Sequence, residues 1–350
     1  MEPEKACRQA KARLLPPKHG CLRNQAGALA SRHWIGGVPV RLLLLGCSGF
    51  VGRELVPYLL ELGHSLTLVS RQANPFPQLA STRLSCLQLN PAEAASWQHD
   101  GLDVALAESD GVVNLAGEPI AEKRWTPAHR QLLLESRVRT TEHLARAIAA
   151  RAQPPAVVVQ GSAVGFYGTS PTARFTESSP AGSDFLAEIC QQWEAAATPM
   201  ASLCRLVTLR IGIVVGPDGG ALGKMLPVFR MGFGGPVGSG RQWMSWIHRQ
   251  DLCRLIAAAL DNPSFQGTYN AVGPEPTTMA AFASGLGQAL GRPSLLPVPG
   301  PVLQLLLGDG AQVVLEGQQV LPERLLAQGF EFHYGQLSAA LAAATNPGSR

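Results

Sequence analysis

Charged residues and long apolar runs are both scarce in this sequence. Asp, Glu, Lys and Arg make up 15% of its 350 residues, whereas hydrophobic residues make up 46%. Disordered chains show the opposite balance, so the composition predicts a folded protein with a large core. No apolar run approaches the roughly 18 residues that a bilayer-spanning helix needs. We therefore expect neither a membrane span nor a membrane partner.

Closely spaced cysteines are missing as well. The seven cysteines are scattered, none of them forms a Cys-x-x-Cys motif, and their number is odd. A disulfide framework or a zinc site needs cysteines that are paired or closely spaced. The pattern therefore predicts no metal site and favours a reducing cytoplasm as the compartment.

The positive net charge is concentrated in residues 1–37. This segment holds seven Lys or Arg against two Glu, which accounts for the whole net charge of +4. A nucleic-acid-binding protein carries its basic stripe on the folded part of the chain, so we expect no nucleic-acid partner. Three interpretations of the segment are open: a disordered basic tail, a start site assigned too early, or a targeting peptide. The last is the least favoured, because the segment has a single Ser and two acidic residues.

From residue 38 onward, short apolar runs alternate with helical stretches. This alternation predicts a parallel sheet with helices on both faces, and right-handed crossovers then give a doubly wound Rossmann fold of the α/β class. The predicted strands are Val40–Leu45, Ser65–Ser70, Leu84–Leu89, Gly111–Leu115, Ala156–Gln160, Leu206–Val215 and Gly267–Val272. The predicted helices are Gly52–Leu62, Ala92–Gln98, Pro127–Arg151, Phe185–Ala197, Gln250–Leu260, Thr278–Leu290, Pro301–Leu307 and Pro322–Gln328.

Residues 216–250 interrupt this alternation. Nine glycines fall within residues 216–247, which predicts loops rather than a regular strand–helix unit. Loops of this length commonly serve as lids or binding loops. We therefore expect Gly-rich substrate loops at 216–250 and a small C-terminal substrate lobe from about residue 216 onward.

A glycine-rich turn joins the first predicted strand to the first predicted helix. It suits a dinucleotide, because Gly46 permits a tight turn, Gly49 lets the backbone approach a pyrophosphate, and Gly52 lets the helix pack against the strand. The free N–H groups at the helix start then face the phosphates. A glycine-rich turn without a ligand is the alternative. The turn reads Gly46-Cys47-Ser48-Gly49-Phe50-Val51-Gly52.

The end of the second predicted strand indicates which dinucleotide is bound. An NAD-preferring site places Asp or Glu there to bind the ribose 2′-hydroxyl, but this strand ends in Ser70-Arg71. An arginine can instead pair with a 2′-phosphate, so Arg71 predicts NADP(H) in preference to NAD(H), with a solvated surface arginine as the alternative. At the end of the fourth strand, Asn114-Leu115-Ala116-Gly117 leaves room for the cofactor ribose.

These residues resemble the extended short-chain dehydrogenase/reductase superfamily, and most closely its branch of epimerase family proteins. That branch is also labelled nucleoside-diphosphate-sugar epimerase or cell-division-inhibitor-like. The resemblance implies an NAD(P)-binding domain at 38–295 and a family-specific C-terminal domain at 296–345, with further cofactor contacts from Glu135, Gly161 and Ser162. The motifs are GCSGFVG at 46–52, SR at 70–71, NLAGEPI at 114–120, RW at 124–125, SRVRTT at 136–141, GSAVGFYG at 161–168, FLAEICQQWE at 185–194, GGPVGSG at 234–240 and WIHRQD at 246–251.

The resemblance also implies a catalytic arrangement from which this chain departs. In the superfamily a Ser ends the fifth strand, and a Tyr-x-x-x-Lys pair on the next helix moves the proton and holds the nicotinamide ribose. Ser162 matches the serine. Leu186 and Cys190 stand at the Tyr and Lys positions, and neither side chain can do that chemistry.

Other side chains are candidates for the missing roles. Tyr167 lies five residues after Ser162 and is the candidate proton donor, with a packing role as the alternative. Cys190 is either a reactive thiol or a small core residue. Tyr167, Lys224 and His248 are candidate substrate contacts, against a surface lysine and a buried structural histidine as alternatives.

Two functions remain open at this point. The first is an atypical NADP(H)-dependent oxidoreductase or epimerase that acts on a small molecule, for which a nucleotide sugar is one candidate. The second is a non-catalytic NADP(H)-binding regulatory protein with a link to cell division. The retained cleft favours the first function, and the missing Tyr and Lys favour the second. A homodimer is open in either case.

Overall fold

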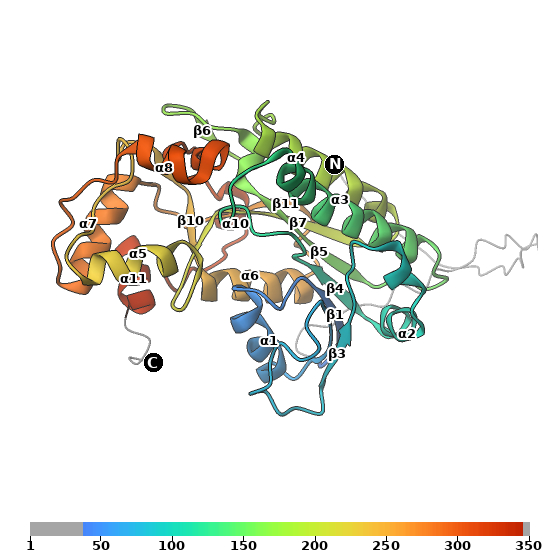
Figure 1. The fold of residues 1–350 in the computed structure, drawn as a ribbon. Coiled ribbons are helices and arrows are strands. Elements are labelled where there is room, and N and C mark those ends of the chain that lie inside the picture. The colour runs from blue at the N-terminus through green and yellow to red at the C-terminus, as the bar shows by residue number, and fades with distance from the viewer. Residues whose placement is uncertain (1–37, 346–350) are drawn as a thin grey trace, which may run out of the picture. The chain divides into compact units, whose positions relative to one another are not determined.

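A seven-stranded parallel sheet forms the centre of the structure, a computed structural model that describes residues 38–345 (Figure 1). The predictions for residues 1–37 lie outside the described residues. The sheet runs in the order β11-β7-β5-β4-β1-β2-β3. Strands β2 and β3 are therefore added on one side of β1, and β4 and the later strands on its other side, as in a Rossmann fold. The predicted fold class is confirmed. The strands are β1 (Arg41–Leu45), β2 (Ser65–Ser70), β3 (Leu84–Gln88), β4 (Gly111–Asn114), β5 (Val157–Ala163), β7 (Arg205–Ile211) and β11 (Gly267–Ala271).

Helices cover both faces of this sheet (Figure 1). One face packs against α1 (Gly52–Glu61) and α6 (Arg249–Asp261), and the other packs against α2 (Asp100–Glu108), α3 (Pro127–Ala149) and α4 (Phe185–Ala197). The consecutive leucines of β1 explain why, because successive side chains of a strand point to opposite faces. Leu42 and Leu44 join the core beside α1 and α6, whereas Leu43 and Leu45 join the core beside α2 and α3.

Several predicted elements differ from the observed ones. Ala94–Gln98 is a 3-10 turn rather than a full helix, and α2 follows it where no helix was expected. The predicted strand Leu206–Val215 is broken at Gly212, whose Cβ would lie 2.5 Å from the carbonyl oxygen of Ser245. Beyond this break, β8 (Ile213–Val215) leaves the main sheet and pairs with β10 (Trp246–His248).

The segment predicted as Gly-rich loops contains a regular helix, α5 (Gly220–Arg230). Its glycines lie at the helix start and in the turns around it, so composition alone concealed the apolar stripe of Leu222, Leu226 and Phe229. These three side chains are buried against α7 (Met279–Leu290) and α11 (Leu337–Thr345) in a second hydrophobic core. This core belongs to the small C-terminal lobe.

No helix among residues 38–345 is both long and apolar enough to cross a bilayer.

The remaining elements of the C-terminal half are short. The other elements are β6 (Arg174–Phe175), which pairs with β13 (Gln319–Val320), β9 (Trp243–Met244), which pairs with β12 (Thr277–Thr278), and the helices α8 (Gly300–Leu307), α9 (Gln312–Leu315) and α10 (Glu323–Ala327).

A buried carboxylate holds the C-terminal segment against the main sheet layer. Asp251 lies on α6, is completely buried, and accepts hydrogen bonds from the backbone N–H groups of His333 and Tyr334, each at 2.8 Å. The N-cap of α6 is His248, whose side chain accepts a hydrogen bond from the N–H of Gln250.

We predict that Asp251→Asn destabilises the fold strongly. The amide keeps the volume but loses the charge and one acceptor, so one buried N–H group loses its partner. We expect a loss of about 3 kcal/mol in the free energy of unfolding, measured by urea denaturation. The control is Glu142→Gln, which removes an exposed ion pair with Arg146 and should cost less than about 0.5 kcal/mol. Similar losses in the two variants would contradict the anchoring role of Asp251.

Candidate functional site

The turn after β1 has no space for side chains at two of its glycines. Gly46 adopts a φ of +72°, and a Cβ there would lie 2.3 Å from the backbone nitrogen of Ala116. A Cβ on Gly52 would lie 1.7 Å from the carbonyl oxygen of Cys47. The first contact joins the ends of β1 and β4, and the second sets the start of α1 against the turn.

The start of α1 presents unused hydrogen-bond donors. The backbone N–H groups of Ser48, Gly49 and Phe50 donate to no acceptor within residues 38–345, and the cap residue Val51 provides no side-chain cap. The Cβ position of Gly49 has nothing within 4 Å, so this side of the turn is open. Free N–H groups at a helix N-terminus together form an anion-binding site.

The glycine-rich segment after β8 packs on the turn. Cβ atoms on Gly219 and Gly220 would lie 2.9 and 2.8 Å from the ring of Phe50. The guanidinium of Arg249 lies 4.6 Å from the centre of the same ring, and its Nε donates to Glu54 at 2.6 Å. These contacts connect the C-terminal lobe to the anion-binding turn. The sequence prediction treated the two segments separately.

The end of β2 meets the loop after β4 through an ion pair. Arg71 extends an exposed side chain whose Nη1 lies 3.6 Å from Oε2 of Glu118, and Lys123 binds the other oxygen of this carboxylate at 3.1 Å. The Glu118 side chain is only 9% exposed. Its place in the NLAGEPI motif was visible in the sequence, but its pairing with Arg71 was not.

Lys224 also reaches this loop. Its ammonium group donates to the carbonyl oxygen of Ala121 at 2.6 Å, so α5 is tied to the loop that follows β4. Lys224 therefore lies beside the ion-pair cluster around Glu118, and its role as a substrate contact stays a prediction.

A buried polar network backs the ends of β4 and β5. The Asn114 side chain donates to Thr141 at 3.1 Å and to Gln160 at 3.0 Å, and its oxygen accepts from the N–H of Ala116. The indole of Trp193 donates to the same Thr141 at 3.1 Å. The network therefore fixes the Asn114 side chain and, through it, the backbone at Ala116.

Ser162 and Tyr167 belong to a second buried network. The Ser162 hydroxyl donates to Glu194 at 2.6 Å, and Glu194 forms a two-point ion pair with Arg210. Arg210 also donates to the Tyr167 hydroxyl, which in turn donates to Asn270 at 2.6 Å.

Tyr167 is therefore fully engaged. Only 3% of the residue is exposed, its ring stacks on Phe175, and burial raises the pKa of its hydroxyl. A proton donor for a bound substrate has to face an open pocket. The Tyr167 hydroxyl is instead held inside the protein by Arg210 and Asn270.

An apolar cluster occupies the start of α4. Leu186 packs there with Phe185, Trp125 and Ile120, and Val313 from the C-terminal segment joins the same cluster. One turn along α4, Cys190 is buried, and burial raises the pKa of its thiol to about 12. The two positions of α4 that match the superfamily's Tyr and Lys therefore carry no charge, and the nearest charge on this face is Glu194, which pairs with Arg210.

The other predicted site residues lie on helix surfaces or in the core. Glu135 accepts hydrogen bonds from Gln131 and Arg139 on its own helix, α3. His248 is 2% exposed, and its ring lies 4.0 Å from the ring of Tyr334. Gly161 lies at the end of β5, where its Cβ would lie 3.4 Å from the Trp193 ring.

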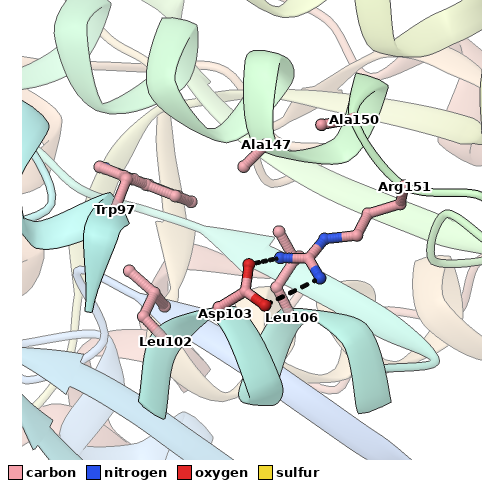
Figure 2. A pocket seen from close by; sticks show the side chains of 7 residues that line it. All are labelled: Trp97, Leu102, Asp103, Leu106, Ala147, Ala150 and Arg151. Atoms are coloured by element: carbon pink, nitrogen blue, oxygen red, sulfur yellow. Dashed lines mark hydrogen bonds and ion pairs between the residues drawn. The ribbon is translucent and has the colours of Figure 1, made fainter. Parts of the chain in front are cut away.

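A hollow between α2 and α3 lies apart from these residues (Figure 2). It encloses about 270 Å³, and an ion pair between Asp103 and Arg151 crosses it. Arg151 follows the end of α3, close to the amino ends of the strands. No predicted site residue lines this hollow. Among residues 38–345, no three His, Cys, Asp or Glu side chains are grouped as a metal site would require.

Comparison with known proteins identifies the family. Residues 42–272 match the model of the NAD dependent epimerase/dehydratase family. The chain belongs to this family. Residues 298–344 match a domain of unknown function, DUF1731.

Relatives of this family align over most of the chain. The chain is 44% identical to the chloroplastic epimerase family protein SDR39U1 homolog of Arabidopsis thaliana, over 85% of this chain and 84% of the relative. The crystal structure of human epimerase family protein SDR39U1 (isoform2) with NADPH is 38% identical, with a TM-score of 0.78, over 87% of this chain and 99% of that one. The predicted resemblance to epimerase family proteins is confirmed.

A more distant structure shares the fold alone. UDP-glucuronic acid 4-epimerase of Bacillus cereus, in complex with UDP-glucuronic acid and NAD, is 17% identical, with a TM-score of 0.71. It covers 87% of this chain and 98% of its own length.

We predict that Cys190 reacts slowly with alkylating reagents in the native protein. Raising its pKa from 9.0 to about 12 leaves about a thousandfold less thiolate, which is the reactive form. Peptide mapping after iodoacetamide treatment at about pH 8 measures this directly. The internal comparison is Cys86, which is partly exposed on the edge strand β3. Labelling of Cys190 faster than Cys86 would identify it as an activated thiol.

Proposed function

We propose that this protein binds NADP(H) at the carboxyl ends of β1, β2, β4 and β5. The observation that carries the proposal is the set of unused N–H donors at Ser48, Gly49 and Phe50, next to the open Cβ position of Gly49. A pyrophosphate supplies the acceptors that these donors lack. The human relative whose crystal structure contains NADPH supports the same cofactor.

Arg71 supplies the preference for the phosphorylated cofactor. It extends from the end of β2, where the adenosine ribose of a Rossmann dinucleotide lies. Its exposed guanidinium is paired only at 3.6 Å with Glu118, and Lys123 can keep that carboxylate neutralised. Arg71 is therefore available to a 2′-phosphate.

We predict that Arg71→Ala weakens NADPH binding about 10- to 100-fold, the usual effect of losing a charge-assisted contact. NADH binding should change less than about threefold, because NADH lacks the 2′-phosphate. Fluorescence titration with both nucleotides measures the ratio. Arg146→Ala is the control, because it removes an exposed arginine that pairs with Glu142 on the surface of α3. Equal losses for NADPH and NADH in Arg71→Ala would contradict the assignment.

Gly49 and Gly52 of the turn give a test of pyrophosphate binding. Gly49→Ala should leave thermal stability unchanged, because its Cβ meets nothing within 4 Å. The methyl group would nevertheless block the close approach of a phosphate, so we expect NADPH affinity to fall at least about tenfold.

Gly52→Ala provides the contrast, because its Cβ collides with the Cys47 carbonyl and should destabilise the fold itself. Thermal unfolding and NADPH titration of both variants separate the two effects. Gly49→Ala with unaltered NADPH affinity would argue against a pyrophosphate at this turn.

The favoured activity is hydride transfer between NADP(H) and a small molecule, in an atypical oxidoreductase or epimerase. The support is that the C-terminal lobe contacts the loop after β4 through Lys224 and packs Gly219 and Gly220 on Phe50 of the turn. A nucleotide sugar is the candidate substrate. The Bacillus cereus epimerase, a structure that shares the fold, is in complex with a nucleotide sugar and NAD.

A specific observation favours a second function. No charged side chain replaces the Tyr and Lys positions on α4, and the hydroxyls of Ser162 and Tyr167 are held within the protein. This pattern supports a non-catalytic NADP(H)-binding protein whose surface serves regulation. Incubation of the purified protein with NADPH and a panel of carbonyl compounds and nucleotide sugars separates the two. Cofactor oxidation or epimer formation supports the enzyme, whereas tight binding without turnover across the panel supports the regulatory protein.

We also propose a reducing compartment and a homodimer for this protein. The five cysteines of the described residues are all free thiols, which suits a reducing compartment such as the cytoplasm. Sedimentation of the purified protein tests the homodimer.

A further inference from the structure

Exposed apolar side chains gather on the C-terminal lobe. Among residues 38–345, seven of the thirteen large apolar side chains that are exposed lie there, and four of these seven are at least 60% exposed. They lie on α5, on the loop after it, on the loop before α8, and on α8 itself. These seven residues form the apolar patch: Val228, Met231, Phe233, Leu295, Leu296, Val302 and Leu305.

Backbone contacts bring the two loops of the apolar patch side by side. The N–H of Leu296 donates to the carbonyl oxygen of Gly234 at 3.1 Å, and the N–H of Phe233 donates to that of Val228 at 3.1 Å. The helix α8 starts at Gly300, directly after the second loop. Residues far apart in sequence therefore form one surface. It lies at the end of the structure that holds α7 and α8, away from α2 (Figure 1).

The other exposed apolar side chains on helices and turns are isolated. Leu62, Val104, Leu132 and Leu203 each lie on a different element. Single exposed apolar side chains are normal on a protein surface, whereas a contiguous patch marks an interaction site. The apolar patch therefore calls for a partner and the isolated side chains do not.

The two parts of the chain that carry the apolar patch are basic. Residues 219–250 and 276–308 together contain five Lys or Arg and no Asp or Glu. Four of these five cations are exposed. The surface of this part of the lobe therefore combines apolar side chains with positive charge alone.

Two of these cations lie directly beside the patch. Arg230 precedes Met231 in the chain. Arg292 precedes Pro293, whose ring lies 3.9 Å from the Cβ position of Gly232. Both arginines are exposed, and neither guanidinium is paired with another residue in the described part of the chain. Their charges are therefore available to an anionic partner.

This combination fits a bilayer of anionic phospholipids better than it fits a protein. Protruding apolar side chains enter the boundary between headgroups and acyl chains, and arginines bind the lipid phosphates. Lipid chains adapt to the shape of protruding side chains, whereas a protein partner needs a matching pocket for each of them. A second copy bound through the same patch would bring the arginines of both copies together, which is repulsive.

We propose that the apolar patch docks this protein on the surface of an anionic phospholipid membrane. Met231, Phe233 and Leu295 enter the headgroup boundary, and Arg230 and Arg292 bind phosphates. The proposal is independent of the proposed cofactor. It departs from the expectation of no membrane partner, which rested on the length of apolar runs. Run length predicts helices that span a bilayer, but it does not reveal a patch that is assembled from separate loops.

Vesicle flotation of the full-length protein tests the apolar part of the patch. The vesicles contain equal parts of phosphatidylglycerol and phosphatidylcholine. In the double variant Phe233→Ser/Leu295→Ser we expect binding at least about tenfold weaker, with unchanged thermal unfolding because both side chains are exposed. The matched control is Leu62→Ser/Val104→Ser, which removes two exposed apolar side chains outside the patch and should bind like the unaltered protein.

A second pair of variants tests the charges. Arg230→Gln/Arg292→Gln should weaken binding to the same vesicles about 25-fold, or about fivefold for each arginine. Arg139→Gln/Arg146→Gln removes the same net charge from the surface of α3 and should have a much smaller effect. Equal weakening by the two pairs would show attraction by net charge alone and would overturn the proposal.

A direct readout places the patch in the lipid. The variant Phe233→Trp should gain fluorescence that lipids brominated on their acyl chains quench, and the unaltered protein should lack this quenched component. Absence of such quenching in the vesicle-bound variant would contradict insertion of the patch.

The remaining outcomes each overturn the proposal. The basic residues 1–37 are identical in all variants, so vesicle binding that survives every change to the patch would belong to another part of the chain. Failure of the unaltered protein to bind these vesicles would also refute the proposal. Sedimentation without vesicles tests the alternative occupant, because a dimer that Phe233→Ser/Leu295→Ser converts to a monomer would make the patch an interface between copies.

Discussion

The close approach of backbone segments at the end of β1 is the constraint on which the site depends. Gly46 meets Ala116, and Gly52 meets Cys47, at distances that exclude any side chain. Because β1 is central in the sheet, these contacts fix the start of α1 over the point where the strand order reverses. The N–H groups of the turn are thereby left without acceptors among the described residues, so the packing that builds the fold also leaves the donors on which the proposed pyrophosphate site rests.

Buried charges hold the elements around the ends of β5 and β7 together. Arg210 and Glu194 form an ion pair in the interior. Glu194 binds the Ser162 hydroxyl and Arg210 binds the Tyr167 hydroxyl, so both hydroxyls are engaged within the protein. A buried ion pair adds little net stability compared with apolar packing, but breaking it is costly. The network is therefore better understood as a device that fixes β5, α4, β7 and β11 in one arrangement.

Local patterns predicted the elements well, because they depend on residues close in sequence. The apolar strand before Gly46 is a signal of this kind. The helix α5 was missed because its glycines resemble loop composition. The networks were missed for a different reason: Tyr167 meets Asn270 across 103 residues of chain. Glu118 lay in a recognised motif, but its ion pairs with Arg71 and Lys123 are contacts that no local pattern specifies.

Cofactor binding and proton transfer are physically separable in this fold. The donors that suit a dinucleotide come from backbone N–H groups of the turn and from Arg71 just after β2, so they do not depend on α4. The proton chemistry of the superfamily depends on α4, where this chain has Leu186 in an apolar cluster and a neutral Cys190. Val313 of the C-terminal segment packs against that cluster. A proton for any hydride transfer must therefore come from a group other than the two at the Tyr and Lys positions of α4.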